Sequence, residues 1–181
     1  MSETNGYSVW LTPTGGEAVP LKRLIANLSM TLHSPLFVPH VTLLGGVCRP
    51  EGRILEHCRR LAAEMPPFRV RFTGVGWNDS FFRCLYLDVD TSPSLLRAHR
   101  TAVEQCGVVN DHSFMPHLSI AYGQLEEAKK QLVARDMACP YPPGFKVTHI
   151  DLVRTHGHPE DWRLVERFPF ATEAMPVSAA R

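Results

Sequence analysis

The sequence lacks the charge imbalance that carries a protein onto long nucleic acid. Its 181 residues include 19 lysines and arginines against 18 aspartates and glutamates, and the net charge is +1 at pH 7. A protein that grips a long phosphate backbone by releasing counterions normally shows a clear basic excess. We therefore expect a small phosphorylated substrate, or a nucleic acid that is met only at its end.

Long hydrophobic runs, metal-binding cysteine spacings and phosphate-binding glycine patterns are also missing. No run approaches about 18 apolar residues, and the first six residues hold no hydrophobic segment, so we expect neither a membrane span nor a secretory leader. The five cysteines include no CxxC pair. Nothing resembles a P-loop, a Rossmann glycine motif or a Ser-His-Asp order. The simplest location is a reducing cytoplasm.

One short pattern is present twice. Residues 39–43 read Pro-His-Val-Thr-Leu, and residues 116–120 read Pro-His-Leu-Ser-Ile. Alternate side chains of a β-strand share a face, so each histidine and the hydroxyl two residues later project together, about 6.5–7 Å apart. A lone histidine in an apolar strand is usually structural. Two copies with the same flanking proline and the same hydroxyl offset instead indicate a shared functional site.

The two halves of the chain repeat one order of elements, namely strand, helix, motif strand, helix and strand. Alternating residues predict strands at 7–12 and 81–89, and the spacing between these strands is close to that between the histidines. Turn residues at 78–80 and a final hairpin of 145–155 with 162–168 require antiparallel pairing. We therefore predict an α+β fold with two pseudo-symmetric lobes. Each lobe is a small, mainly antiparallel sheet flanked by helices, and a central cleft separates them.

We expect a single two-lobed domain over residues 1–171. Its internal repeat covers about 7–78 and 81–170, and residues 172–181 carry no pattern and are expected to be a flexible tail. Apolar residues at helical spacing predict the helices of the domain. These helices are expected near residues 20–32, 50–65, 93–106 and 125–132.

The paired motifs resemble those of the 2H phosphoesterase superfamily. Within it, the sequence is most similar to cyclic phosphodiesterases that act on ADP-ribose 1'',2''-cyclic phosphate and nucleoside 2',3'-cyclic phosphates, and the resemblance covers about residues 7–170. It implies that His40 and His117 are catalytic. It also implies that Thr42 and Ser119 bind the phosphate.

Two aromatic residues also match family positions. Trp10 corresponds to an aromatic residue that faces the nucleoside, and its place on one strand face with Ser8 and Thr12 agrees with that role. Tyr122 corresponds to a position near the phosphate, although strand alternation puts it on the face opposite His117. Tyr122 therefore reaches the cleft only if the strand ends or bulges first.

Two imidazoles can open a cyclic phosphate without a metal or a cofactor. One takes a proton from water and the other protonates the leaving oxygen, and each role is worth about 10²–10⁴-fold. The hydroxyls can donate hydrogen bonds to the phosphoryl oxygens. We expect His117 to be the base and His40 the acid. A metal site at His156-x-His158 is the alternative, although a single pair of this kind in a polar turn is usually solvated.

The sequence thus predicts a metal-independent phosphodiesterase that converts small cyclic phosphates of nucleosides or ADP-ribose to monophosphates. We expect it to act as a monomer with no membrane partner. Two alternatives stay open. One is an RNA-end enzyme of the same superfamily, either 2',5'-RNA ligase-like or a 3'-end phosphodiesterase. The other is a non-catalytic nucleotide-binding module, which would not need two titratable groups.

Overall fold

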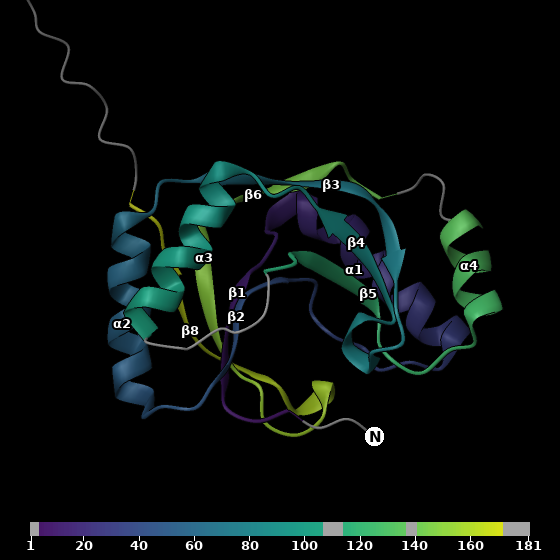
Figure 1. Ribbon diagram of the computed structural model, residues 1–181, viewed down its shortest axis with the longest axis horizontal. Helices are drawn as coiled ribbons and strands as arrows, with labels where there is room; N and C mark the ends of the chain where they lie inside the picture. The colour runs from purple at the N-terminus through teal and green to yellow at the C-terminus, as the bar shows by residue number, and fades with distance from the viewer. Residues whose placement is uncertain (1–3, 107–113, 137–140, 172–181) are drawn as a thin grey trace, which may run out of the picture.

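The computed structural model describes residues 4–106, 114–136 and 141–171, which form an α+β fold on one curled sheet (Figure 1). Eight strands lie in the order β6-β3-β4-β5-β2-β1-β7-β8, and all neighbours are antiparallel. The strands are β1 (Tyr7–Leu11), β2 (Val41–Val47), β3 (Phe68–Trp77), β4 (Leu85–Val89), β5 (His117–Ala121), β6 (Gly144–Val147), β7 (His149–Arg154) and β8 (Arg163–Pro169). The helices are α1 (Gly15–Leu32), α2 (Glu51–Glu64), α3 (Pro93–Cys106) and α4 (Glu127–Asp136). The predicted fold class is confirmed.

The two halves of the sheet meet where the two motif strands pair. Val41 in β2 lies opposite Leu118 in β5, and each of these residues directly follows its motif histidine. Read outward from this pair, the order is equivalent on both sides, with β1 beside β2 and β4 beside β5. The predicted lobes are therefore the halves of one continuous sheet rather than two separate sheets.

The helices cover the sheet and bury its apolar side chains. α2 and α3 pack against each other, α2 contacts β7 and β8, and α3 contacts β2 and β3. α1 contacts β5 and β6, while α4 lies at the opposite end of the molecule from α2 (Figure 1). The thiols of Cys58 and Cys106 are buried between these elements and pack as small hydrophobes.

α1 delivers the chain to the first motif strand. It begins at Gly15, before the predicted start at Pro20, which lies inside the helix. At its other end His33 adopts a positive φ of 53°, and the N–H of His33 donates to the carbonyl of Ser29. This left-handed residue ends the helix. The chain then runs through residues 34–40 into β2.

Two predicted strands are wrong in their extent. The sequence predicts a strand over 81–89, but Phe81–Arg83 form a 3-10 helix, η1, and β4 begins only at Leu85. One strand is also predicted over 145–155, where the structure has β6 beside β3 and β7 between β1 and β8. The in-out alternation of burial continues to Val147 and then stops, because residues 149–153 are all buried. The chain crosses here from one half of the sheet to the other.

Both predicted hairpins are confirmed, since β3 pairs with β4 across the turn at 78–80 and β7 pairs with β8. The tail expected at residues 172–181 lies outside the described residues. None of the helices in the described ranges has the length and apolar character needed to cross a membrane.

Candidate active site

The structure places all six residues singled out by the sequence around one cavity of about 350 Å³. The cavity lies where β2 and β5 meet, beside the point of pseudo-symmetry of the sheet. The six residues in its wall are Trp10, His40, Thr42, His117, Ser119 and Tyr122. The fold thus brings residues from both halves of the chain to a single site.

The two imidazoles are held in the same way. The Nδ1–H of His40 donates to the carbonyl of Val38 at 2.7 Å, and the Nδ1–H of His117 donates to the carbonyl of Met115 at 2.9 Å. A carbonyl oxygen only accepts, so Nδ1 carries the proton in each ring. In the neutral ring, Nε2 is then left with a lone pair, and neither Nε2 has a bond to another described residue. Each Nε2 is therefore available to move a proton.

Burial keeps both imidazoles neutral in the free protein. Burial, with a smaller contribution from the charge of His117, lowers the pKa of His40 from 6.5 to about 4, although the hydrogen bond to the Val38 carbonyl opposes this shift. Burial also lowers the pKa of His117. Desolvation disfavours the imidazolium form, whereas an anion between the two rings would favour it. An anion bound between the two rings would therefore raise their pKa values and promote their protonation.

An aromatic ring from the neighbouring strand lies against each imidazole. Trp10, opposite Thr42 in the sheet, stacks on His40 with ring centroids 3.6 Å apart and planes at 9°. Tyr86 occupies the equivalent place in β4 and meets the ring of His117 edge-on at 5.3 Å. Tyr86 was not predicted from the sequence, although it lies at nearly the repeat spacing from Trp10. These rings fix the orientation of both histidines.

Gly76 makes room for the second of these rings. It lies opposite Tyr86 in β3, and a Cβ atom there would come within 2.4 Å of the tyrosine ring. A side chain at this position would displace the ring that contacts His117. The glycine is therefore part of what positions the second motif histidine.

The two motif hydroxyls are not equivalent. The hydroxyl of Ser119 donates to the carbonyl of Phe82 at 2.8 Å. The hydroxyl of Thr42 has no hydrogen-bond partner among the described residues. The Thr42 hydroxyl is therefore free to donate to a ligand. The Ser119 hydroxyl can donate to a ligand only if it first gives up its hydrogen bond to Phe82.

Tyr122 reaches the cavity because β5 ends at Ala121. Its ring stacks on Phe37 at 3.8 Å between centroids. Burial raises the pKa of the Tyr122 phenol, which therefore stays protonated. It can act as a hydrogen-bond donor but not as a base.

Phe82, Arg83 and Trp162 also line the cavity and were not predicted. Arg83 is the one lysine, arginine, aspartate or glutamate among the described lining residues. Its Nη1 donates only to the sulfur of Met115, a weak acceptor 3.7 Å away. The guanidinium is therefore free to bind an anion. Phe82 and Arg83 belong to η1, and Trp162 follows a second short helix, η2 (Pro159–Asp161), so strand alternation could not find them.

The His156-x-His158 turn has a structural role in the described residues. Asp161 accepts the backbone N–H of His158 at 3.3 Å and so caps η2, and Nδ1 of His156 lies 3.2 Å from the side-chain oxygen of Asn5. No three histidine, cysteine, aspartate or glutamate side chains in the described ranges come together as a metal-binding group.

Comparisons with known proteins identify the family of this chain. The sequence profile of the 2'-5' RNA ligase superfamily matches residues 6–159. The cyclic phosphodiesterase of Arabidopsis thaliana is 26% identical over 125 residues, which cover 69% of this chain and 69% of that protein.

Three solved structures share the fold at low sequence identity. Escherichia coli LigT complexed with 3'-AMP has a TM-score of 0.59 at 14% identity, covering 94% of this chain and 99% of that one. The protein TT0787 of Thermus thermophilus has a TM-score of 0.60 at 21% identity, covering 92% and 100%. Usb1 of Kluyveromyces marxianus has a TM-score of 0.53 at 13% identity, covering 92% and 99%.

Proposed function

Since this chain belongs to the 2'-5' RNA ligase superfamily of 2H phosphoesterases, we propose that it is a metal-independent phosphodiesterase that hydrolyses small cyclic phosphates. The proposed substrates are ADP-ribose 1'',2''-cyclic phosphate and nucleoside 2',3'-cyclic phosphates, and the products are monophosphates. The observation that carries this proposal is the pair of imidazoles, each with its Nε2 free in one cleft. The name of the Arabidopsis relative supports it. We also propose that residues 1–171 act as one catalytic domain.

Each imidazole has one proton to move. The Nε2 of the base takes a proton from water while the water oxygen attacks phosphorus. The bond from phosphorus to one ribose oxygen breaks, and this oxygen takes a proton from Nε2 of the acid. The ring opens to a phosphate monoester, and the net reaction is the addition of one water. The pseudo-symmetric placement of the two histidines suits an attack in line with the leaving oxygen.

We assign His117 as the base and His40 as the acid. The indole face of Trp10 against His40 stabilises a protonated ring. Burial and the charge of Arg83 lower the pKa of His117 and favour its neutral form, against the opposing charge of Asp88. The pKa of His40 is about 4 in the free protein, and the negative charge of the bound substrate raises it, so that Nε2 of His40 takes up a proton from solvent before the reaction.

The remaining polar groups are suited to the phosphoryl oxygens. Thr42 has a free hydroxyl, and Arg83 has a guanidinium without a carboxylate partner in the described residues. Ser119 and the neutral phenol of Tyr122 also line the cleft. Donors that are already oriented stabilise the charge that develops in the transition state.

We expect Arg83→Gln to lower kcat/KM for a cyclic phosphate on the order of 10–100-fold, because it removes a charged hydrogen-bond donor to the phosphate. Arg83→Lys should recover part of the loss. The matched control is Arg69→Gln. Arg69 does not line the cleft, and its guanidinium is paired with the carboxylate of Glu17 at a distance of 3.0 Å. Steady-state kinetics on the three variants measure the effect, and equal losses in Arg69→Gln and Arg83→Gln would contradict it.

The pH dependence should differ between the free protein and its substrate complex. Since burial lowers both histidine pKa values below 6.5 in the free protein, kcat/KM should be highest below pH 6.5 and fall as the pH rises and the acid loses its proton. The bound phosphate raises the pKa of the acid, so the fall in kcat should occur at higher pH. Both apparent pKa values belong to the coupled pair. Superimposable pH profiles for kcat and kcat/KM would argue against a phosphate-controlled pair.

Product analysis by phosphorus NMR tests the function itself. The panel contains a nucleoside 2',3'-cyclic phosphate, ADP-ribose 1'',2''-cyclic phosphate and short RNAs with 2',3'-cyclic, 3'-phosphate and 3'-hydroxyl ends. Each reaction is run with and without EDTA. We expect ring opening of the small compounds at the same rate in both conditions. Turnover of the RNA ends alone would favour the RNA-end enzyme, and the absence of turnover throughout would favour a binding module.

A further inference from the structure

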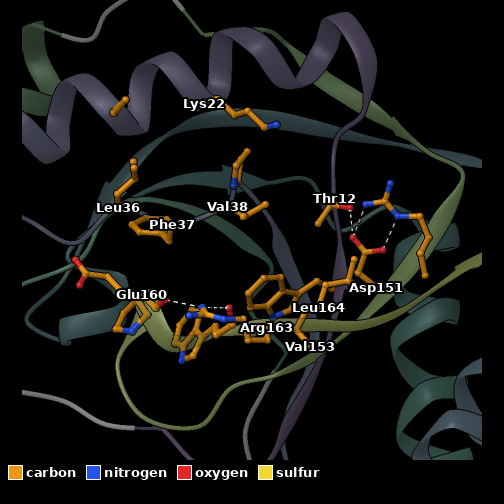
Figure 2. A pocket seen from close by; sticks show the side chains of 16 residues that line it. Thr12, Lys22, Leu36, Phe37, Val38, Asp151, Val153, Glu160, Arg163 and Leu164 are labelled. Atoms are coloured by element: carbon orange, nitrogen blue, oxygen red, sulfur yellow. Dashed lines mark hydrogen bonds and ion pairs between the residues drawn. The ribbon is translucent and has the colours of Figure 1, made fainter.

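A second cavity, of about 670 Å³, is larger than the candidate active site and is drawn in Figure 2. Trp10 and Trp162 line both cavities, so these two indoles form the partition between them. The rest of the wall comes from α1, from the segment that leads into β2, and from β7 and β8. Its volume is in the range of cavities that hold nucleotide-sized ligands, about 300–1,000 Å³.

Exposed apolar side chains gather at this second cavity. Leu36 is 56% exposed, Val38 54% and Leu164 56%, and all three line it. They are three of the eight large apolar side chains that remain exposed in the described part of the chain. Clusters of this kind mark binding surfaces rather than ordinary protein surface. The walls therefore offer an apolar contact for a planar group.

One side of the cavity is cationic. Nε and Nη2 of Arg167 donate to the two carboxylate oxygens of Asp151 at 2.7 and 2.8 Å, and Thr12 donates to the same carboxylate at 2.7 Å. Asp151 is only 3% exposed, whereas the side chain of Arg167 is 47% exposed. The buried carboxylate thus holds the guanidinium in one orientation while part of it still faces solvent.

Lys22 adds a second positive charge. It projects from α1, while Val153 and Leu164 lie on the opposite side of the cavity (Figure 2). It forms no ion pair with any described residue. The acidic side chain of Glu160 lies at the other end of the cavity from Asp151 (Figure 2). Arg163 also lines the cavity, and its Nη1 donates to the backbone carbonyls of Glu160 and Trp162. Three cationic side chains thus face two carboxylates, and one of these, Asp151, is already paired with Arg167. The cavity therefore favours an anionic group, which can bind near Lys22 and Arg167.

We propose that this cavity binds a nucleoside diphosphate group attached to the sugar that carries the cyclic phosphate. The cyclic phosphate lies between His40 and His117, and the chain of the substrate passes the partition of Trp10 and Trp162. The diphosphate contacts Lys22 and Arg167, and the base lies against the exposed apolar wall. This inference rests on the proposed function. It makes ADP-ribose 1'',2''-cyclic phosphate a better substrate than a mononucleoside cyclic phosphate.

The distal contacts should act on binding rather than on the chemical step. They lie outside the cavity that contains the histidines, so they hold the ground state and the transition state alike. Loss of one such contact raises KM and leaves kcat unchanged. A mononucleoside 2',3'-cyclic phosphate has no distal group and should not sense the change.

The test compares two variants of this wall on both substrates. Lys22→Met removes a cation that has no ion pair among the described residues, and Leu164→Glu places a negative charge on the exposed apolar wall. Each should raise KM for ADP-ribose 1'',2''-cyclic phosphate about tenfold or more and leave both constants for a nucleoside 2',3'-cyclic phosphate unchanged. The matched control is Lys129→Met on α4, an exposed lysine that lines neither cavity and should change nothing.

Equal changes on both substrates, or none on either, would overturn the proposal while leaving the proposed function intact. If the wild-type protein hydrolyses neither substrate, the proposed function fails, and calorimetry with ADP-ribose then tests the cavity directly. Weaker binding of ADP-ribose by Lys22→Met and Leu164→Glu, but not by Lys129→Met, supports the distal site. The same affinity in all four proteins rejects it.

Discussion

Replacing either motif histidine by alanine should lower kcat for a cyclic phosphate by roughly 10²–10⁴-fold, because each imidazole carries one of the two proton transfers. The two histidines have the same hydrogen-bonding arrangement, so we expect losses of similar size. Both rings donate Nδ1–H to a backbone carbonyl, and both present a free Nε2 to the same cleft. His40→Ala and His117→Ala should therefore each come close to abolishing turnover, while circular dichroism and thermal melting show a folded protein.

His99 provides the matched control for these variants. Its Nδ1–H also donates to a backbone carbonyl, that of Leu43 at 2.8 Å, and its ring stacks on Phe114 at 3.8 Å. It lies on α3 and lines none of the cavities described above. His99→Ala should lower the free energy of unfolding and leave kcat almost unchanged. Near-normal turnover in His40→Ala or His117→Ala would mean that the repeat is structural.

The repeat was readable from the sequence because its two copies keep the same strand periodicity. Pairing of Val41 with Leu118 puts both histidines beside the symmetry point of the sheet, as the flanking residues predict. Strand alternation also predicts the correct face for Trp10. It does not predict that His40 covers one face of the indole. A contact between side chains of neighbouring strands depends on their register, which no local pattern states.

The lining residues that were not predicted from the sequence lie where local pattern and tertiary structure disagree. Phe81 and Phe82 are typical strand residues, yet this segment closes into η1, where the N–H of Gly123 donates to the carbonyl of Phe81 at 3.0 Å. That turn brings Arg83 into the cleft. Trp162 comes from the connection between β7 and β8 and meets Trp10 edge-on only because β7 pairs with β1.

Thr42→Val should lower kcat on the order of 10²-fold, which is the usual effect of losing one preorganised donor to a developing oxyanion. Valine has nearly the same shape as threonine and keeps the strand preference. The Thr42 hydroxyl has no hydrogen bond to a described residue, so its loss leaves no protein acceptor unpaired. The free energy of unfolding should therefore stay the same while turnover falls.

Ser119→Ala should affect stability more and turnover less than Thr42→Val, although Ser119 and Thr42 occupy equivalent places in the repeat. Its hydroxyl already donates to the carbonyl of Phe82 at 2.8 Å, so a bound phosphate gains this donor only by breaking an existing bond. We expect a smaller loss of kcat than in Thr42→Val and a loss of about 1 kcal/mol in the free energy of unfolding. Single-turnover rates and chemical denaturation of both variants separate the two effects. Equal losses of kcat would mean that breaking the Ser119–Phe82 hydrogen bond costs no free energy when substrate binds. The two hydroxyls would then have equivalent functions.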